Sequence, residues 1–173
     1  MKKLLAASVL IFLAITLMHA PAFAQDDEVV IIPYRWDQST IVFSDQFITL
    51  QAGWAACKKG PLQAFRSATH ISWTLDKEGV QVDSGEVTRK YWGPIHYIPL
   101  QAGVCLGKTP ETIPAITWSF PLGQLEAGEY SLHFYWWLDH PVTDLGDNDG
   151  NGRPDFFSGT IKDVDISIHV IDR

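Results

Sequence analysis

The segment from Asp147 to Asp155, DNDGNGRPD, carries oxygen-bearing side chains at alternating positions. Calcium is a hard cation that takes about six to eight oxygen ligands, and alternating carboxylates on a tightly turning backbone can converge on it. Gly152 supplies the conformational freedom that such a turn needs. The segment therefore predicts a calcium site. The alternative is a polar turn without an ion, because Asp, Asn and Gly favour turns in any case.

The pattern D-x-D-x-N-G-x-P-D resembles the calcium loop of the EF-hand. It is also similar to loops of thrombospondin type 3 repeats and of the FG-GAP class, which bind calcium without paired helices. The resemblance implies side-chain oxygen ligands from Asp147, Asp149, Asn151 and Asp155. It also implies a backbone carbonyl ligand from Arg153. A calcium loop is therefore compatible with a chain made of strands.

One position departs from the EF-hand pattern. Ser158 stands where an EF-hand loop has a bidentate Glu. A shell without that carboxylate is short of ligands, so we expect weak binding, with a Kd of about 10⁻⁴–10⁻³ M as in extracellular modules. Three nearby carboxylates could complete the shell, and the sequence does not decide between them: Asp139, Asp144 and Asp163.

The elements that must hold this loop are strands, because alternation of apolar and polar residues dominates the chain. The segment EYSLHFYWWL, residues 129–138, places apolar side chains at every even position. The other strands are expected at about 28–32, 40–50, 70–76, 79–88, 94–100, 114–120 and 162–171. Hardly any helix is expected. The sequence therefore predicts an all-β fold, a two-sheet antiparallel sandwich of seven to nine strands.

A short motif specifies the kind of sandwich. The segment from Leu125 to Tyr130, LEAGEY, resembles the L-x-x-G-x-Y tyrosine corner of immunoglobulin-like and fibronectin type III domains. The resemblance implies that 129–138 and 162–171 are the last two strands, with the calcium loop in the connection at about 140–161. The chain lacks the cysteine spacing of antibody domains, so only the broader immunoglobulin-like class is implied.

Aromatic residues are expected beside the loop. If the last two strands pair, Tyr135 and Trp137 lie on the outer face of their sheet, with Trp137 near Asp163 and Tyr135 near Asp165. Aromatic rings beside carboxylates suit a sugar, whose apolar face stacks on a ring, and Trp and Tyr also anchor protein partners. The alternative is that another loop covers both rings and makes them part of the core.

The N-terminal segment predicts export. Residues 1–24 have two lysines, an apolar run and an A-F-A ending, which is typical of a secretory signal peptide. Residues 25–173 then form a single domain that is secreted, extracellular or periplasmic. The alternative is a retained membrane anchor, for which the apolar run is short.

The two cysteines, Cys57 and Cys105, predict a disulfide, because an even pair outside the cytosol is usually bonded. The alternatives are two buried thiols or a thiol nucleophile. The chain has a formal net charge of −7, which argues against nucleic acid or an anionic membrane as a partner.

Signatures of an enzyme are weak. Neither G-x-S-x-G nor H-E-x-x-H occurs. Paired carboxylates for a hydrolase depend on a through-space distance that sequence spacing does not give. The sequence therefore favours a calcium-binding, non-catalytic binding or adhesion domain whose partner is an extracellular protein or polysaccharide. A carbohydrate-binding module that uses Tyr135 and Trp137 is the first alternative, and a small secreted hydrolase is the second.

Overall fold

The computed structural model describes residues 27–33, 39–100, 105–106, 110–147 and 149–173. The expected signal peptide, residues 1–24, lies outside these described residues. Within them, no helix is long and apolar enough to cross a membrane.

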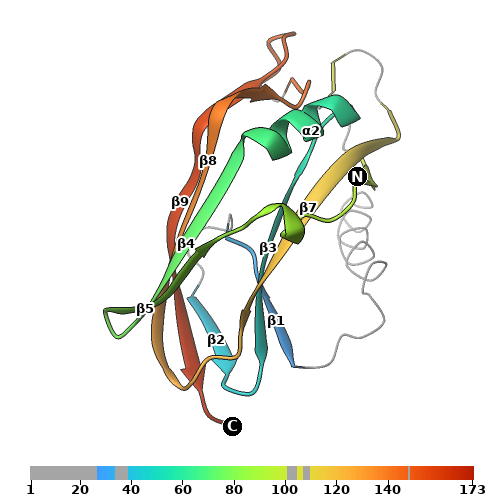
Figure 1. The fold of residues 1–173 in the computed structure, drawn as a ribbon. Coiled ribbons are helices and arrows are strands. Elements are labelled where there is room, and N and C mark those ends of the chain that lie inside the picture. The colour runs from blue at the N-terminus through green and yellow to red at the C-terminus, as the bar shows by residue number, and fades with distance from the viewer. Residues whose placement is uncertain (1–26, 34–38, 101–104, 107–109, 148) are drawn as a thin grey trace, which may run out of the picture.

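The described residues form nine strands in two sheets that pack as a sandwich (Figure 1). The four-stranded sheet has the order β1 (Glu28–Ile31), β3 (Phe47–Ala55), β7 (Thr112–Gly123) and β6 (His96–Pro99). The five-stranded sheet has the order β2 (Ser39–Phe43), β9 (Phe156–Ile171), β8 (Gly128–Thr143), β4 (Thr69–Lys77) and β5 (Val80–Glu86). The expected all-β sandwich is confirmed.

The expectation of a purely antiparallel sandwich is wrong, because both sheets are mixed. Strand β1 pairs in parallel with β3, and β2 pairs in parallel with β9. The expected single strand at 40–50 is also two strands, β2 and β3, in different sheets with a turn between them. Strand β1 lies at one edge of the four-stranded sheet, and β2 lies at one edge of the five-stranded sheet.

The core follows from the alternation in the sequence. On β8 the even positions from Tyr130 to Leu138 are buried, and two of them, Phe134 and Trp136, meet Trp118 of β7 across the sandwich. The Trp118 ring stacks on Phe134 with centroids 5.8 Å apart and meets Trp136 edge-on at 6.2 Å. Burial of such large aromatic side chains dominates the energetics of a core of this size.

The tyrosine corner is present. The Tyr130 hydroxyl donates a hydrogen bond to the backbone carbonyl of Glu126 at 3.0 Å, and the ring is buried. This bond fixes the chain where it enters β8, the strand that leads to the candidate calcium loop.

One helix was not expected from the sequence. Helix α2 (Lys59–Ala68) follows β3 and lies across one end of the sandwich (Figure 1). It buries Leu62, Phe65 and Ala68, which share one face at three-residue spacing. The Phe65 ring stacks on Trp54 of β3 at 4.4 Å. The helix therefore closes the core at the end of the sandwich where the candidate calcium loop lies (Figure 1).

The disulfide between Cys57 and Cys105 is confirmed, with Cα atoms 5.8 Å apart and a sequence separation of 48. Cys57 lies between β3 and α2, and Cys105 lies between β6 and β7. The bond therefore joins two connections at the same end of the sandwich.

Candidate calcium loop and the outer face of the five-stranded sheet

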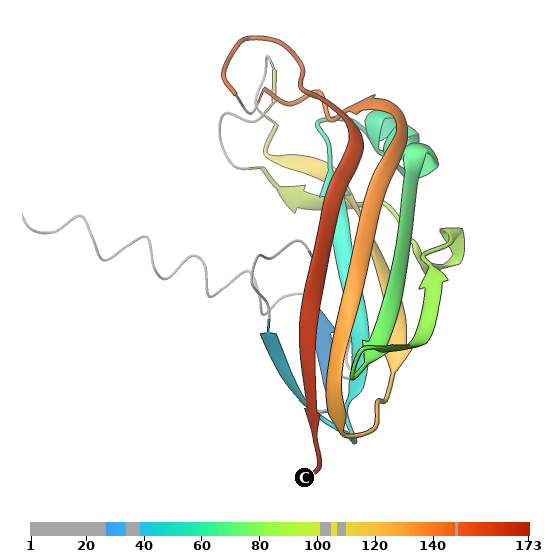
Figure 2. The same cartoon turned by 90° about the vertical axis from the view of Figure 1, so that its left-hand side faces the viewer.

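The candidate calcium loop is the tip of the longest hairpin in the described chain. Strands β8 and β9 each have 16 residues, and their pairing continues to Thr143 and Phe156. The residues between these two positions form a loop that stands at the end of the sandwich beyond the helix (Figure 2). The expected connection at 140–161 is therefore shorter, because β8 and β9 extend into it.

Hydrogen bonds link residues within the loop. One carboxylate oxygen of Asp147, Oδ2, accepts a bond from the Gly152 amide at 3.0 Å. The Asp149 carboxylate accepts bonds from the backbone and side-chain amides of Asn151, at 3.1 and 2.7 Å. The side-chain oxygen of Asn151 in turn accepts a bond from the Arg153 amide at 2.8 Å. Short-range hydrogen bonds of this kind, over two to five residues, mark a series of tight turns.

Asp147 is the residue that a cation would satisfy best. Its second oxygen, Oδ1, is buried and has no hydrogen-bond partner among the described residues. A buried carboxylate oxygen without a donor or a cation is unfavourable. All the side-chain atoms expected to bind the ion are oxygens, which is the ligand type that calcium prefers.

The loop conformation does not by itself gather a complete ligand set. Among the described residues, no three His, Cys, Asp or Glu side chains are grouped so that they could hold a metal ion. Both carboxylate oxygens of Asp149 accept hydrogen bonds from Asn151.

The three additional carboxylates lie in different places. Asp144 is buried just before the loop, where its Oδ1 accepts a bond from the Gly146 amide at 2.7 Å. Asp139 and Asp163 lie on the outer face of the five-stranded sheet, where each is within 4 Å of a histidine. Of the three, only Asp144 is at the base of the loop.

The outer face of the five-stranded sheet carries a ladder of stacked rings, which we call the aromatic ladder: His70 of β4 and Trp137 and Tyr135 of β8. The rings of His70 and Trp137 are nearly parallel at 5.1 Å, and those of Trp137 and Tyr135 at 4.9 Å. Tyr135 and Trp137 are half-buried, so they belong neither to the core nor to fully exposed surface.

Histidines pair with carboxylates around this ladder. Asp139 contacts His70 at 3.1 Å and also His140. The hydrogen bond from His70, assisted by His140, lowers the pKa of Asp139 below its ordinary value of 3.8. The remaining pairs on the strands beside the ladder are His133 with Asp165 at 2.9 Å, His133 with Asp163 at 3.6 Å, and His169 with Glu129. Sequence analysis did not find these pairs, because they depend on the register between strands.

The expected register is displaced by two residues. Asp163 lies opposite Tyr135 and Asp165 opposite His133, whereas Trp137 lies opposite Thr160. The register of β8 and β9 shifts between Trp136 and Trp137 and again before Val142. Such irregularities change which side chains meet across a hairpin, and alternation alone does not locate them.

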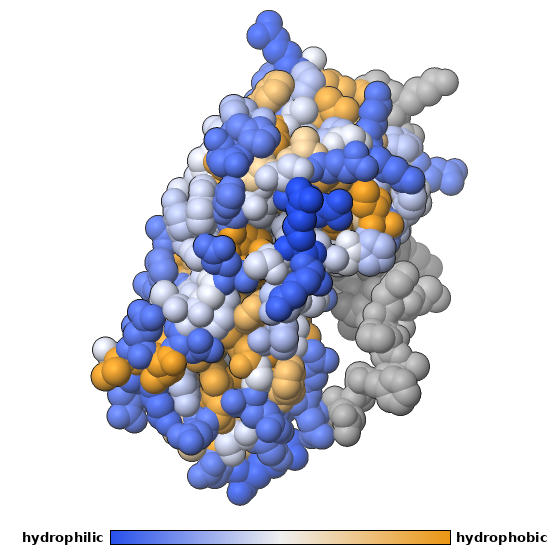
Figure 3. Space-filling view, viewed as in Figure 1, coloured by the Kyte–Doolittle hydropathy of each residue, from blue (hydrophilic) through white to orange (hydrophobic). Residues whose placement is uncertain are grey.

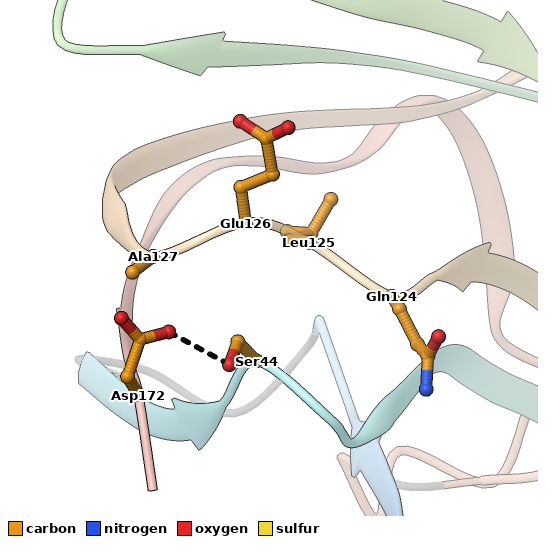
Figure 4. Close-up of a pocket in the computed structure, with 6 residues that line it drawn as sticks. All are labelled: Ser44, Gln124, Leu125, Glu126, Ala127 and Asp172. Carbon is orange, nitrogen blue, oxygen red and sulfur yellow. Dashed lines mark hydrogen bonds between the residues drawn. The ribbon is translucent and has the colours of Figure 1, made fainter.

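The opposite end of the sandwich has a shallow pocket of about 470 Å³ (Figure 4). Its lining residues are Ser44, Gln124, Leu125, Glu126, Ala127 and Asp172. The Ser44 hydroxyl donates to Asp172 at 2.9 Å, as the figure shows. No histidine, lysine or cysteine lines it, so Ser44 has none of the usual nitrogen bases of a nucleophilic serine within the pocket.

Apolar side chains are exposed at one edge of the five-stranded sheet. Figure 3 shows them over the β4–β5 hairpin, where Val80 and Val82 are 68% and 53% exposed. A bulge after Leu75 and the charged side chains of Asp83 and Glu86 interrupt this edge. Such features protect an edge strand from pairing with another chain, so we assign no binding role to it.

No protein-family model matches the chain, and no curated protein matches its sequence. A two-sheet β-sandwich supports many unrelated functions, so the fold does not identify one. The functional argument therefore depends on the calcium loop and on the outer face beside it.

Proposed function

We propose that the protein is a secreted, calcium-binding β-sandwich with a non-catalytic binding or adhesion role at the cell surface or outside the cell. The observation that carries the proposal is the Asp147 carboxylate. One of its oxygens is held by the Gly152 amide, and the other is buried without a hydrogen-bond partner among the described residues. A calcium ion at the loop would supply the missing positive charge.

The ligands would be side-chain oxygens of Asp147, Asp149, Asn151 and Asp155 together with the Arg153 carbonyl. Asp144 is our candidate for completing the shell, because it lies at the base of the loop and is buried. Ser158 is exposed on β9 and brings no carboxylate to the position of the EF-hand Glu. We therefore expect weak binding, with a Kd of roughly 0.1 mM at the strong end of the extracellular range.

Three features support a location outside the cytosol. The chain has a disulfide, which persists in oxidising compartments. Residues 1–24 have the pattern of a signal peptide. Weak calcium sites are also useful where calcium is abundant, as it is outside cells. The partner would be an extracellular protein or polysaccharide, because the acidic chain does not favour nucleic acid or an anionic membrane.

Thermal melts in EDTA and in about 1 mM calcium test the proposal. With a Kd near 0.1 mM, mass action stabilises the folded protein by roughly 1.4 kcal/mol. The melting temperature should then rise by about 3–6 °C. Asp147→Asn keeps the size of the side chain but removes its charge, so the shift should disappear. The control Glu86→Gln removes a charge from an exposed carboxylate on β5 and should keep the shift.

The proposal fails if calcium up to 10 mM leaves the melting temperature of the wild-type protein unchanged. It also fails if Asp147→Asn and Glu86→Gln respond to calcium as the wild type does. In that case any stabilisation would come from screening of the acidic surface and not from the loop.

A carbohydrate-binding module is the second candidate, and the aromatic ladder favours it. Tyr135 and Trp137 are half-exposed rings on a face that also carries carboxylates, which can accept hydrogen bonds from sugar hydroxyls. Against it, the stacked neighbours His70 and Tyr135 cover part of the Trp137 ring. Retention on a glycan array that is lost in Trp137→Ala would support the module, and absence of retention on a broad array would count against it.

A further inference from the structure

We infer that the disulfide Cys57–Cys105 is a positioning device for the calcium loop, and that without it the loop binds calcium more weakly. The inference deepens the proposed function and rests on it. It comes from what the two cysteines contact through their backbones, in addition to the bond between their sulfurs.

Both cysteines bind the short segment that leads into the loop. The Cys57 amide donates a hydrogen bond to the backbone carbonyl of Asp144 at 2.7 Å. Cys105 forms an isolated antiparallel bridge with Gly146. The disulfide joins these two contacts into one unit, since it holds Cys57 and Cys105 together on either side of the segment. The chain just before Asp147 is therefore attached to two segments that are distant in sequence.

The same segment closes the base of the loop. The Gly146 carbonyl accepts a hydrogen bond from the Asp155 amide at 2.9 Å, and the Gly146 amide donates to the Asp144 carboxylate at 2.7 Å. Gly146 precedes Asp147, the first expected ligand, and Asp155 is the last of the five. The backbone at both ends of the ligand set is thus held by residues that the disulfide anchors.

Anchoring of this kind raises the affinity of the loop for calcium by reducing the conformational freedom of the free loop. A loop whose ends are already in place loses less conformational freedom when it closes around an ion, which strengthens binding. If removal of the disulfide leaves the base of the loop formed about one tenth of the time, the apparent Kd rises about tenfold. A disulfide that stabilises only the sandwich would leave the Kd of the folded protein unchanged.

The experiment compares the full mature protein with the double variant Cys57→Ala/Cys105→Ala. Calcium alone is titrated into each protein, and hydrogen exchange of the Asp155 amide is measured without calcium. We expect the Kd to rise about tenfold and exchange at Asp155 to accelerate by at least about tenfold, because the bond to Gly146 opens more often. Leu132→Ala is the control, since it opens a cavity in the core of β8 far from the loop and destabilises the fold without touching the base of the loop.

An unchanged Kd in the double variant overturns the inference, as does an equal loss of affinity in Leu132→Ala. If the double variant does not fold, the folded wild type is compared before and after reduction by dithiothreitol, whose two thiols supply the two electrons and two protons that convert the disulfide to two thiols. If the wild type binds no calcium, the proposed function fails separately. Exchange at Asp155 then still decides whether the disulfide holds the base of the loop.

Discussion

Gly53→Ala is expected to destabilise the protein, although alanine normally favours folding relative to glycine. Gly53 lies in β3 opposite Thr117 of β7. A Cβ atom at this position would lie 2.7 Å from the backbone oxygen of Ile116 and 2.9 Å from the Thr117 Cγ2 methyl group. Ordinary contact begins near 3.4 Å, so the strands must separate locally by about 0.7 Å. The closest atom belongs to the backbone, so a change of side-chain rotamer does not remove the clash.

The magnitude follows from two opposing effects. Overpacking of a well-packed site costs about 1–3 kcal/mol. The lower entropy of an unfolded chain with alanine returns about 0.4–1 kcal/mol. The net loss of unfolding free energy is therefore roughly 1–2 kcal/mol, which lowers the melting temperature by about 3–8 °C.

Gly60→Ala is the matched control. Gly60 lies in α2, and a Cβ atom there meets nothing within 4 Å. The helix preference of alanine, up to about 1 kcal/mol, is offset because the ring of the following Pro61 disfavours a Cβ on the helical residue before it, so the melting temperature should stay close to that of the wild type. Differential scanning calorimetry measures both variants. A Gly53→Ala protein that melts at or above the wild-type temperature would refute the reasoning, because it would mean that β3 and β7 move apart without cost.

Two further substitutions probe contacts that hold β8. Tyr130→Phe removes the hydrogen bond to the Glu126 carbonyl and should lower the unfolding free energy by about 1 kcal/mol, measured from the urea midpoint; an unchanged midpoint would mean that the corner adds nothing. His70→Asn should raise the pKa of Asp139 toward 3.8, because the hydrogen bond from His70 is the main cause of its depression; NMR titration of the Asp139 carboxyl decides this. A depressed carboxyl pKa stabilises the fold at pH above the unfolded value, and this contribution disappears as pH falls through the lower folded value. The wild type should therefore lose more stability than His70→Asn when the pH falls below about 4.

The strands and the disulfide could be predicted because each depends on a strong local signal or a forced choice. Alternation along β8 identifies which side chains of Tyr130 to Leu138 face the core, whatever the partner strand is. A chain with two cysteines allows a single pairing within the chain. The tyrosine corner is a contact over four residues, so a motif reports it without knowledge of the rest of the fold.

Features that depend on neighbours in space were missed for a physical reason. Alternation shows that a strand has one buried face but not which strand lies beside it, so the parallel pairs of β1 and β2 left no signal. Helix α2 has only ten residues and has Gly60 and Pro61 in its first turn, where both residues weaken the helical signal. Its three buried positions therefore make a weak pattern. The pairs of histidine with carboxylate follow from a register that irregularities in β8 and β9 set.

The candidate calcium loop and two rings of the aromatic ladder, Tyr135 and Trp137, belong to the same hairpin, yet the structure separates them. Trp137 pairs with Thr160, and regular pairing stops after Leu138 and resumes only at Val142, before the base of the loop. The segment at the base of the loop contacts Cys57 and Cys105, whereas Trp137 stacks on His70 of β4. We therefore expect that calcium bound at the tip would leave the rings in place. Ligand binding that depends on calcium would then point to the tip, and binding that is indifferent to calcium but sensitive to Trp137 would point to the outer face.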